Sequence, residues 1–175
     1  GGFIVAAFTV AELENMVIVN MGDYKTAKGE KKLMTKDLGS CVGVAVRDPQ
    51  TGVGGLLHVM LPHHGEAGDG MPFVAAKYAD TGLDEMVRAL VMQGAVRERL
   101  VAKIAGAAHM IRNATIPESM DISSRNLEAV TKKLAELQIP LLAAEVGEHF
   151  PRTVVFEPGS GTFRIYTPGR QERQI

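Results

Sequence analysis

The sequence predicts a single domain with the fold of an α/β sandwich, made of mixed β-sheets with flanking helices. The chain has 175 residues, of which 46% are hydrophobic and 22% charged, which is typical of a globular domain with a sizeable core. Short β-branched runs and amphipathic helical segments both occur. They do not alternate as regular βαβ units, so a doubly wound parallel sheet is not expected.

Residues 16–170 are expected to form this domain. Residues 1–15 include a short apolar run at 3–8 with no basic residues before it, which does not match a signal peptide. We therefore expect 1–15 to be a non-native or disordered extension outside the fold, and 171–175 to be a C-terminal tail.

The first half of the chain is predicted to be mainly β-structure. The elements expected from apolar patterning and turn residues are a strand at 17–20, a polar loop through Lys32, a hairpin over about 33–61, a glycine-rich polar loop at 62–71 and a short helix at 72–79.

The next element is a helix over 82–93, with Asp80 or Thr81 as its N-cap and Gly94 as its stop. Its apolar residues recur at helical spacing. The residues expected to face the core are Leu83, Met86, Val87, Leu90 and Val91.

The remaining predicted elements are one helix and several strands. Ser123 or Ser124 is expected to cap a second helix. The inward residues of that helix are predicted to be Leu127, Val130, Leu134 and Leu137. The predicted strands are 100–110, 140–146 and a hairpin over 153–167 that turns at 157–161.

The hairpin within 33–61 can bring a thiol and an imidazole together. A turn signal at 48–52 separates its two apolar runs. A turn centred on 49–50 puts Cys41 directly opposite His58, and a four-residue loop makes them diagonal neighbours on one face. A three-residue loop or a bulge would put them on opposite faces, so the pairing requires an even loop.

The two faces of this hairpin differ in character. The face expected to be core carries Val42, Val44, Val46, Val53, Leu57, Val59 and Leu61. The other face carries Cys41, Gly43, Ala45, Gly54, Leu56, His58 and Met60. Small residues at Gly43, Ala45 and Gly54 either leave space for a substrate side chain or serve only close backbone packing.

Cys41 is the only cysteine in the chain, so no intrachain disulfide can form and a reducing cytoplasm is expected. A lone thiol is usually an inert core residue. A thiol beside an imidazole, however, is the minimal machinery of a cysteine nucleophile, and a protonated histidine would favour the thiolate. Thr35 and Asp37 are both candidates for the group that orients His58.

Other candidate groups have simpler explanations. Ser40 is a rival nucleophile, but its surroundings do not match a serine nucleophile elbow. His63 and His64, with Asp69, lie in a glycine-rich loop where solvent exposure is more common than metal binding, so no metal or cofactor is expected. His109 follows an apolar strand and is expected to be a core or turn histidine, with a role in a site wall as the alternative.

Charge and hydropathy exclude two function classes. The net charge is −1, which gives no electrostatic footprint for nucleic acid. No apolar run approaches the roughly 18 residues needed to span a bilayer, so no membrane insertion is expected.

Three segments carry a resemblance to a known family. They are Leu38-Gly39-Ser40-Cys41-Val42-Gly43-Val44, Asp48-Pro49 and Gly54-Gly55-Leu56-Leu57-His58-Val59-Met60-Leu61-Pro62. Further matches are 77–80, 103–110 and 122–126. Over about 17–167 the chain resembles CheD, the chemoreceptor glutamine deamidase of bacterial and archaeal chemotaxis. The segment 146–152 departs from the family pattern.

The resemblance implies residue roles. Cys41 matches the nucleophile, His58 the catalytic histidine and Thr35 the third active-site residue, which favours Thr35 over Asp37. The family fold is an α/β sandwich similar to the catalytic domain of glutamine-deamidating bacterial toxins.

The resemblance also implies a reaction and partners. The expected reaction converts glutamines on the cytoplasmic helices of chemoreceptors to glutamate and releases ammonia. We expect backbone N–H groups at Gly39 and Ser40 to stabilise the oxyanion. The alternative function is binding and stimulation of a CheC-type phosphatase. A general amidase acting on free glutamine would need a deep pocket, which the sequence does not indicate.

Overall fold

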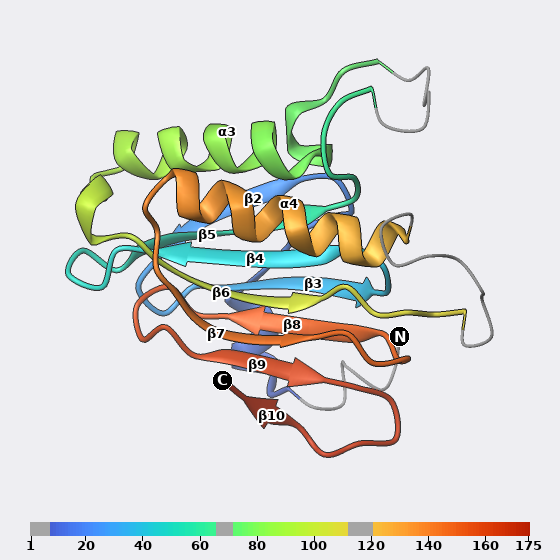
Figure 1. The fold of residues 1–175 in the computed structure, drawn as a ribbon. Helices are drawn as coiled ribbons and strands as arrows, with labels where there is room; N and C mark the ends of the chain where they lie inside the picture. Colours follow the sequence, from blue (N-terminus) through green and yellow to red (C-terminus); the bar gives the residue numbers. More distant parts are fainter. Residues whose placement is uncertain (1–7, 66–71, 112–120) are drawn as a thin grey trace.

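Two five-stranded sheets pack face to face, and two helices cover the outer face of one of them (Figure 1). The structure is a computed structural model that describes residues 8–65, 72–111 and 121–175. This arrangement confirms the predicted sandwich of mixed sheets with flanking helices.

The helix-covered sheet has the strand order β2-β5-β4-β6-β7. Its strands are Tyr24–Lys28 (β2), Val53–Val59 (β5), Val42–Arg47 (β4), Val101–Gly106 (β6) and Leu141–Val146 (β7). All neighbours are antiparallel except β6 and β7, which are parallel. The helices over this sheet are Ala79–Met92 (α3) and Ile122–Glu136 (α4), with short 3-10 turns at Ala75–Lys77 (η2) and Arg97–Arg99 (η3).

The second sheet has the order β1-β3-β8-β9-β10. Its strands are Met16–Ile18 (β1), Lys32–Leu38 (β3), Arg152–Phe156 (β8), Phe163–Tyr166 (β9) and Arg173–Gln174 (β10). Only β1 and β3 run parallel. The predicted 153–167 hairpin is present as β8 and β9, whereas β10 lies within the predicted C-terminal tail.

Each face of the β4–β5 hairpin packs into a different core. The predicted core face, except Leu61, packs under the helices with Val42, Val44, Val46, Val53, Leu57 and Val59. The opposite face packs between the two sheets, where Cys41, Ala45 and Leu56 meet Leu33, Leu38, Val154, Phe156, Phe163 and Ile165. Both faces are therefore buried.

The small residues on the inter-sheet face serve close packing and do not leave open space. A Cβ added at Gly43 would lie 3.0 Å from Leu38 Cδ1, and one at Gly54 would lie 3.0 Å from Pro158 Cβ. Ala45 is almost fully buried. Of the two alternatives for these small residues, close packing is the one observed, because neighbouring atoms fill the space at Gly43 and Gly54.

Two predicted elements before β4 need correction. The polar loop through Lys32 contains β2, an edge strand that pairs with β5. Its lysines and half-buried residues give no strong apolar pattern, as is common in edge strands. The segment at the start of the predicted 33–61 hairpin is β3, which belongs to the other sheet and pairs with β8.

Both long helices begin before their predicted caps. Helix α3 begins at Ala79, after the N-cap residue Tyr78, and Asp121 caps α4 by accepting a hydrogen bond from the Ser123 N–H at 3.3 Å. The apolar stripes are as predicted, except that Val91 is exposed and Leu127 and Leu137 are only partly buried.

The N-terminal segment contacts the second sheet, whereas the sequence predicts an extension outside the fold. Residues Val10–Glu14 form a short helix (α2), and Phe8 packs edge-on against Tyr166 with a ring-centroid distance of 5.3 Å. Residues 1–7 lie outside the described residues. No described helix is long and apolar enough to cross a membrane.

Candidate active site

The chain crosses from one sheet to the other between β3 and β4, and Cys41 ends this crossover. The crossover consists of residues 39–41, and each of its three backbone carbonyls accepts a hydrogen bond. The Gly39 carbonyl accepts from the Ala108 N–H at 2.8 Å, and the Cys41 carbonyl accepts from the Ala107 N–H at 2.8 Å. The Ser40 carbonyl accepts from the Asn126 side chain at 3.0 Å. The loop that carries the thiol is therefore fixed to the β6–α4 region.

The register of β4 and β5 places the thiol and the imidazole on one face. Gly43 lies opposite His58, so Cys41 and His58 are diagonal neighbours. The turn between Asp48 and Val53 has four residues, with Gly52 at a φ of 74°. This confirms the even loop that the sequence analysis requires.

Thr35 reaches His58 from the opposite sheet. Its Oγ1 lies 2.6 Å from His58 Nδ1 and 2.7 Å from the Val19 carbonyl oxygen. The carbonyl can only accept, so the hydroxyl donates to Val19 and must accept from His58. The proton of the neutral imidazole therefore sits on Nδ1, and Nε2 carries the lone pair.

The His58 ring is buried, with 1% of the residue exposed, and its Nε2 has no hydrogen-bond partner among the described residues. Burial lowers the pKa of His58 to about 4, against an opposing effect of the Asp37 charge. Burial also raises the pKa of the Cys41 thiol. The resting pair is thus a neutral thiol beside a neutral imidazole, so the thiolate that a protonated histidine would favour is not the resting form.

Asp37 and Ser40 do not take the alternative roles considered for them. Asp37 is exposed, sits at a φ of 57° where the β3–β8 register shifts, and contributes only its charge to His58. No hydrogen bond joins the Ser40 hydroxyl to a histidine within the described part of the chain, so Ser40 has no base there.

Of the two expected oxyanion donors, Gly39 and Ser40, only one has an N–H group that is free among the described residues. The Gly39 N–H already donates to the Asp37 carbonyl at 3.0 Å. The N–H groups of Ser40 and Cys41 donate to no acceptor in the described ranges. The donors next to the thiol that are free for a ligand are therefore at Ser40 and Cys41, and the expectation for Gly39 does not fit.

Two residues missed by the sequence analysis complete the site's framework. Gly106 has a φ of 122°, and a Cβ there would lie 2.3 Å from the Cys41 carbonyl oxygen. Asn126 is fully buried on the inward face of α4. A polar residue within that apolar stripe can be recognised in the sequence, whereas a glycine at the end of a strand, as Gly106 is in β6, gives no such signal.

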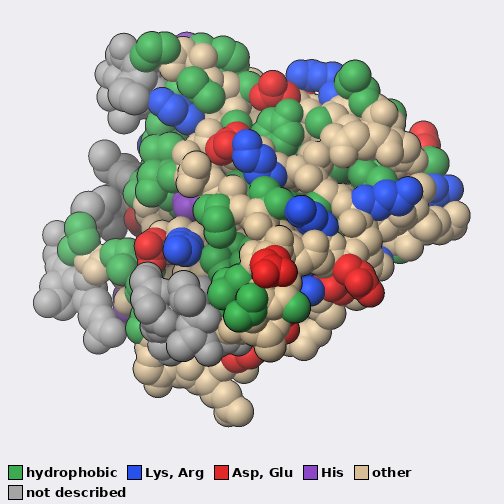
Figure 2. All heavy atoms as spheres, turned by 180° about the vertical axis from the view of Figure 1, so that it is seen from behind, with side chains coloured by type: hydrophobic (Ala, Val, Ile, Leu, Met, Phe, Trp, Pro, Cys, Tyr) green, Lys and Arg blue, Asp and Glu red, His purple; other side chains and the backbone are tan. Residues whose placement is uncertain are grey.

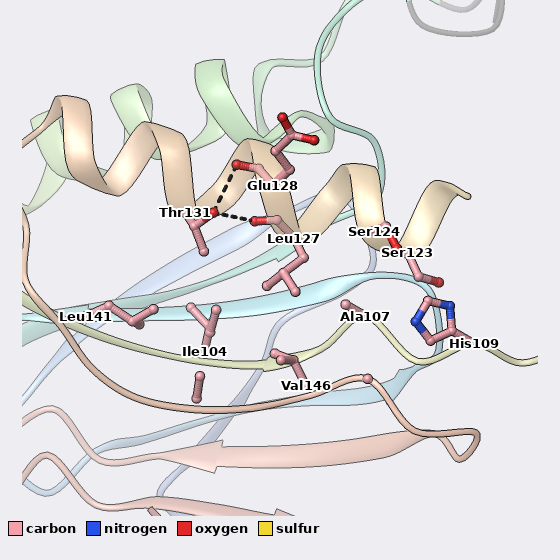
Figure 3. A pocket seen from close by; sticks show the side chains of 12 residues that line it. Ile104, Ala107, His109, Ser123, Ser124, Leu127, Glu128, Thr131, Leu141 and Val146 are labelled. Carbon is pink, nitrogen blue, oxygen red and sulfur yellow. Dashed lines mark hydrogen bonds between the residues drawn. The ribbon is translucent and has the colours of Figure 1, made fainter. Parts of the chain in front are cut away.

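An open groove of about 720 Å³ lies on the other side of the helix-covered sheet, between α4 and the strands β6 and β7 (Figure 3). Its walls are largely apolar, and His109 lies at one end, below Ser123. His109 is half-exposed and pairs with Asp121 at 2.5 Å, so it is a turn histidine and not a core residue. The groove is separate from the Cys41–His58 face.

The His63-His64 loop has an aromatic environment. The His64 ring packs edge-on against Phe73 and Tyr78. Asp69 lies outside the described residues. Within the part of the chain that the structure describes, no group of three histidine, cysteine or acidic side chains could hold a metal ion.

The surface seen in Figure 2 has mixed charge. Lysine and arginine side chains are interspersed with aspartate and glutamate over this face. It offers no continuous basic surface of the kind that binds nucleic acid.

Comparison with known proteins identifies the family. Residues 60–167 match the family model described as CheD chemotactic sensory transduction. The chain is 43% identical over 163 residues to a probable chemoreceptor glutamine deamidase CheD of Desulfitobacterium hafniense, covering 93% of this chain and 100% of that protein. It is 41% identical over 163 residues, with the same coverage, to the chemoreceptor glutamine deamidase CheD of Halalkalibacterium halodurans.

Among solved structures, the chain is similar to the C-terminal domain of CNFy from Yersinia pseudotuberculosis, with a TM-score of 0.38, 9% identity, and coverage of 91% of this chain and 62% of that one. The family is shown by the sequence matches, which extend over nearly the whole chain. This protein belongs to the CheD family.

Proposed function

We propose that this protein is a cysteine-dependent deamidase that converts specific glutamines of chemoreceptors to glutamate in the cytoplasm. The names of its relatives, chemoreceptor glutamine deamidases, support the reaction. The observation that carries the cysteine chemistry is the hydrogen bond between Thr35 and His58 Nδ1, which leaves the buried Nε2 lone pair free on the face of Cys41.

The proposed first half-reaction forms a thioester. His58 Nε2 takes the proton of the Cys41 thiol as Sγ attacks the side-chain carboxamide carbon of the substrate glutamine. The negative charge that develops on the carboxamide oxygen is met by the N–H groups of Ser40 and Cys41. The C–N bond then breaks, and the imidazolium returns its proton to the leaving nitrogen, which departs as ammonia.

The second half-reaction hydrolyses the thioester. His58 Nε2 removes a proton from water as the water oxygen attacks the thioester carbon. The C–S bond breaks, Cys41 regains its proton from the imidazolium, and the substrate side chain leaves as a carboxylic acid, which releases its remaining proton to water to give glutamate. The net reaction consumes one water and releases one ammonia, with no cofactor.

The neutral resting state suits this mechanism. A neutral imidazole with a lone pair on Nε2 can act at once as a base, whereas an imidazolium cannot. The raised pKa of Cys41 keeps the buried thiol protonated until His58 removes the proton during attack. Thr35 keeps the ring in the tautomer that this step needs.

The direct test is release of ammonia from a receptor cytoplasmic fragment. Wild type should release ammonia, and Cys41→Ala should not, while Ser40→Ala should retain activity because only its backbone is used. Free glutamine, tested in parallel, should not be consumed. Ammonia release by folded Cys41→Ala, or its loss in Ser40→Ala alone, would refute the assignment.

A CheC-type phosphatase is the second proposed partner, on the basis of the sequence resemblance alone. If this role is separate from catalysis, Cys41→Ala should still bind and stimulate the phosphatase. Loss of both binding and deamidation in this single variant would show that the two roles share the thiol.

A further inference from the structure

We infer that Asn126 is a positioning residue that sets the placement of Cys41 relative to His58. This inference rests on the proposed function, because it concerns the same pair. It goes beyond that proposal because it assigns a role to a side chain on the helix layer, which contributes no group to the proposed chemistry.

Asn126 joins the two segments that carry the pair. Its Nδ2 donates one hydrogen to the Ser40 carbonyl and the other to the Met60 carbonyl, each at 3.0 Å. Ser40 immediately precedes Cys41, and Met60 lies two residues after His58. One amide group therefore connects the crossover loop to the end of β5.

This connection lies where the strand ladder has ended. The last pair between β4 and β5 at this end is Val42 with Val59. Beyond this pair, the Met60 N–H donates to the Lys77 carbonyl at 2.9 Å and not to β4. Nothing in the β4–β5 ladder itself then holds Cys41 at a fixed distance from the β5 chain, and Asn126 supplies the link.

Ser40 depends on this side chain more than its neighbours do. The carbonyls of Gly39 and Cys41 accept backbone N–H groups, whereas the Ser40 carbonyl accepts the Asn126 amide. Asn126 is 0% exposed, so no solvent is available to replace either bond. Loss of the amide would leave two buried carbonyls unpaired, one directly before Cys41.

The orientation of the amide is unambiguous. Both of its contacts are carbonyl oxygens, which only accept, so the nitrogen must face them. Its oxygen, Oδ1, is buried without a partner among the described residues. An unpaired polar atom on a helix face is unfavourable, so the two donated bonds are the evident reason for an asparagine here.

The test uses the fact that Cys41 is the only cysteine, so alkylation of the whole protein by iodoacetamide reports this thiol alone. The quantity compared is the factor by which His58→Ala slows alkylation at neutral pH. We expect a factor of about tenfold in the wild-type background and less than about twofold in an Asn126→Leu background, as for two coupled residues in a double-mutant cycle. Asn126→Ala provides a second background if the leucine variant does not fold.

Thr81→Val is the matched control. Thr81 Oγ1 donates to the Ala75 carbonyl at 2.8 Å, so this change also removes a side-chain bond from a helix to a backbone carbonyl, here in the 3-10 turn η2 and not in the crossover loop. It should lower thermal stability and leave the His58 factor at its wild-type value. With a receptor fragment, Asn126→Leu should lower kcat about tenfold or more with KM changed less than about twofold.

The possible outcomes distinguish the positioning role of Asn126 from the existence of the Cys41–His58 pair. A His58 factor that persists in folded Asn126→Leu and Asn126→Ala would overturn the positioning role and leave the Cys41–His58 pair intact. A factor near one in the wild type itself would overturn both the pair and the role of Asn126. Loss of the factor in Thr81→Val as well would show that general loosening, not Asn126, is responsible.

Discussion

At the scale of single residues, the Thr35 hydroxyl determines which nitrogen of His58 carries the proton. It donates to the Val19 carbonyl and must therefore accept from Nδ1. The ring is consequently held as the tautomer with a free Nε2. A small hydroxyl does here what a carboxylate does in other nucleophile–base–orienter systems, without adding a buried charge.

Replacing the Thr35 hydroxyl should reduce activity with little change in packing volume. Thr35→Val keeps the shape but leaves the His58 Nδ1–H and the Val19 carbonyl unpaired, so we expect deamidation kcat to fall about tenfold or more. Thr35→Ser keeps the hydroxyl and should retain most activity. Equal kcat for the valine and serine variants, measured on a receptor fragment, would contradict this role.

The buried His58 should make stability depend on pH. Its folded-state pKa is about 4, below the ordinary value of 6.5, so the unfolded chain binds a proton at a higher pH than the folded protein does. As pH falls from 6.5 to 4, the free energy of unfolding should therefore decrease, by about 3 kcal/mol from this residue.

Urea unfolding between pH 4 and pH 7 measures this dependence. The His58→Gln variant lacks the ionisable ring, so its free energy of unfolding should change less over the same interval. Parallel curves for wild type and His58→Gln would mean that His58 titrates at its ordinary pKa in the folded protein.

At the scale of elements, the crossover between β3 and β4 is held against the end of β6. Gly106 is the point of closest approach, because it combines a φ of 122° with the adjacent Cys41 carbonyl. A side chain cannot be added there without moving the loop that carries the thiol.

Gly106→Ala and Gly94→Ala form a matched pair that isolates this close approach. Gly94 also has a positive φ, of 107°, but nothing lies within 4 Å of an added Cβ. Both changes should incur backbone strain, and Gly106→Ala should lower the free energy of unfolding by about 2 kcal/mol more than Gly94→Ala. Only Gly106→Ala should also lose deamidase activity. Similar unfolding energies for the two variants would contradict the close approach.

The sequence predicts the β4–β5 hairpin correctly for a local reason. The turn residues at 48–52 and the alternation of the two strands determine register and faces together. The edge strand β2 and the change of sheet after β3 depend on long-range pairing. In the sequence, β2 has no apolar periodicity that distinguishes it from a polar loop. No turn signal after β3 distinguishes it from the first strand of a hairpin.

At the scale of the whole molecule, the site exists because the two sheets close on one another. Thr35 belongs to the second sheet and His58 to the helix-covered sheet. No local pattern could choose Thr35 over Asp37, and only the family resemblance favoured it. The close contact of the sheets at Gly43 and Leu38 also explains why the glycine at position 43 leaves no open space on this hairpin face.

Different layers of the molecule position Cys41 and His58. The second sheet orients the imidazole through Thr35, and the helix layer ties the thiol loop through Asn126. The helix-covered sheet lies between them and carries His58 on β5, with Cys41 directly before β4. The proposed reacting groups, Cys41 and His58, can be read from one hairpin, whereas their supports, Thr35 and Asn126, come together only when the whole sandwich is assembled.

The most direct measurement is peptide mass spectrometry of receptor cytoplasmic fragments after incubation with wild type or with Cys41→Ala. Conversion of glutamine to glutamate adds about one mass unit, and we predict this gain at particular glutamines only with the wild type. The same gain with folded Cys41→Ala, or no gain on any cognate receptor with folded, reduced wild type, would contradict a Cys41-dependent deamidase.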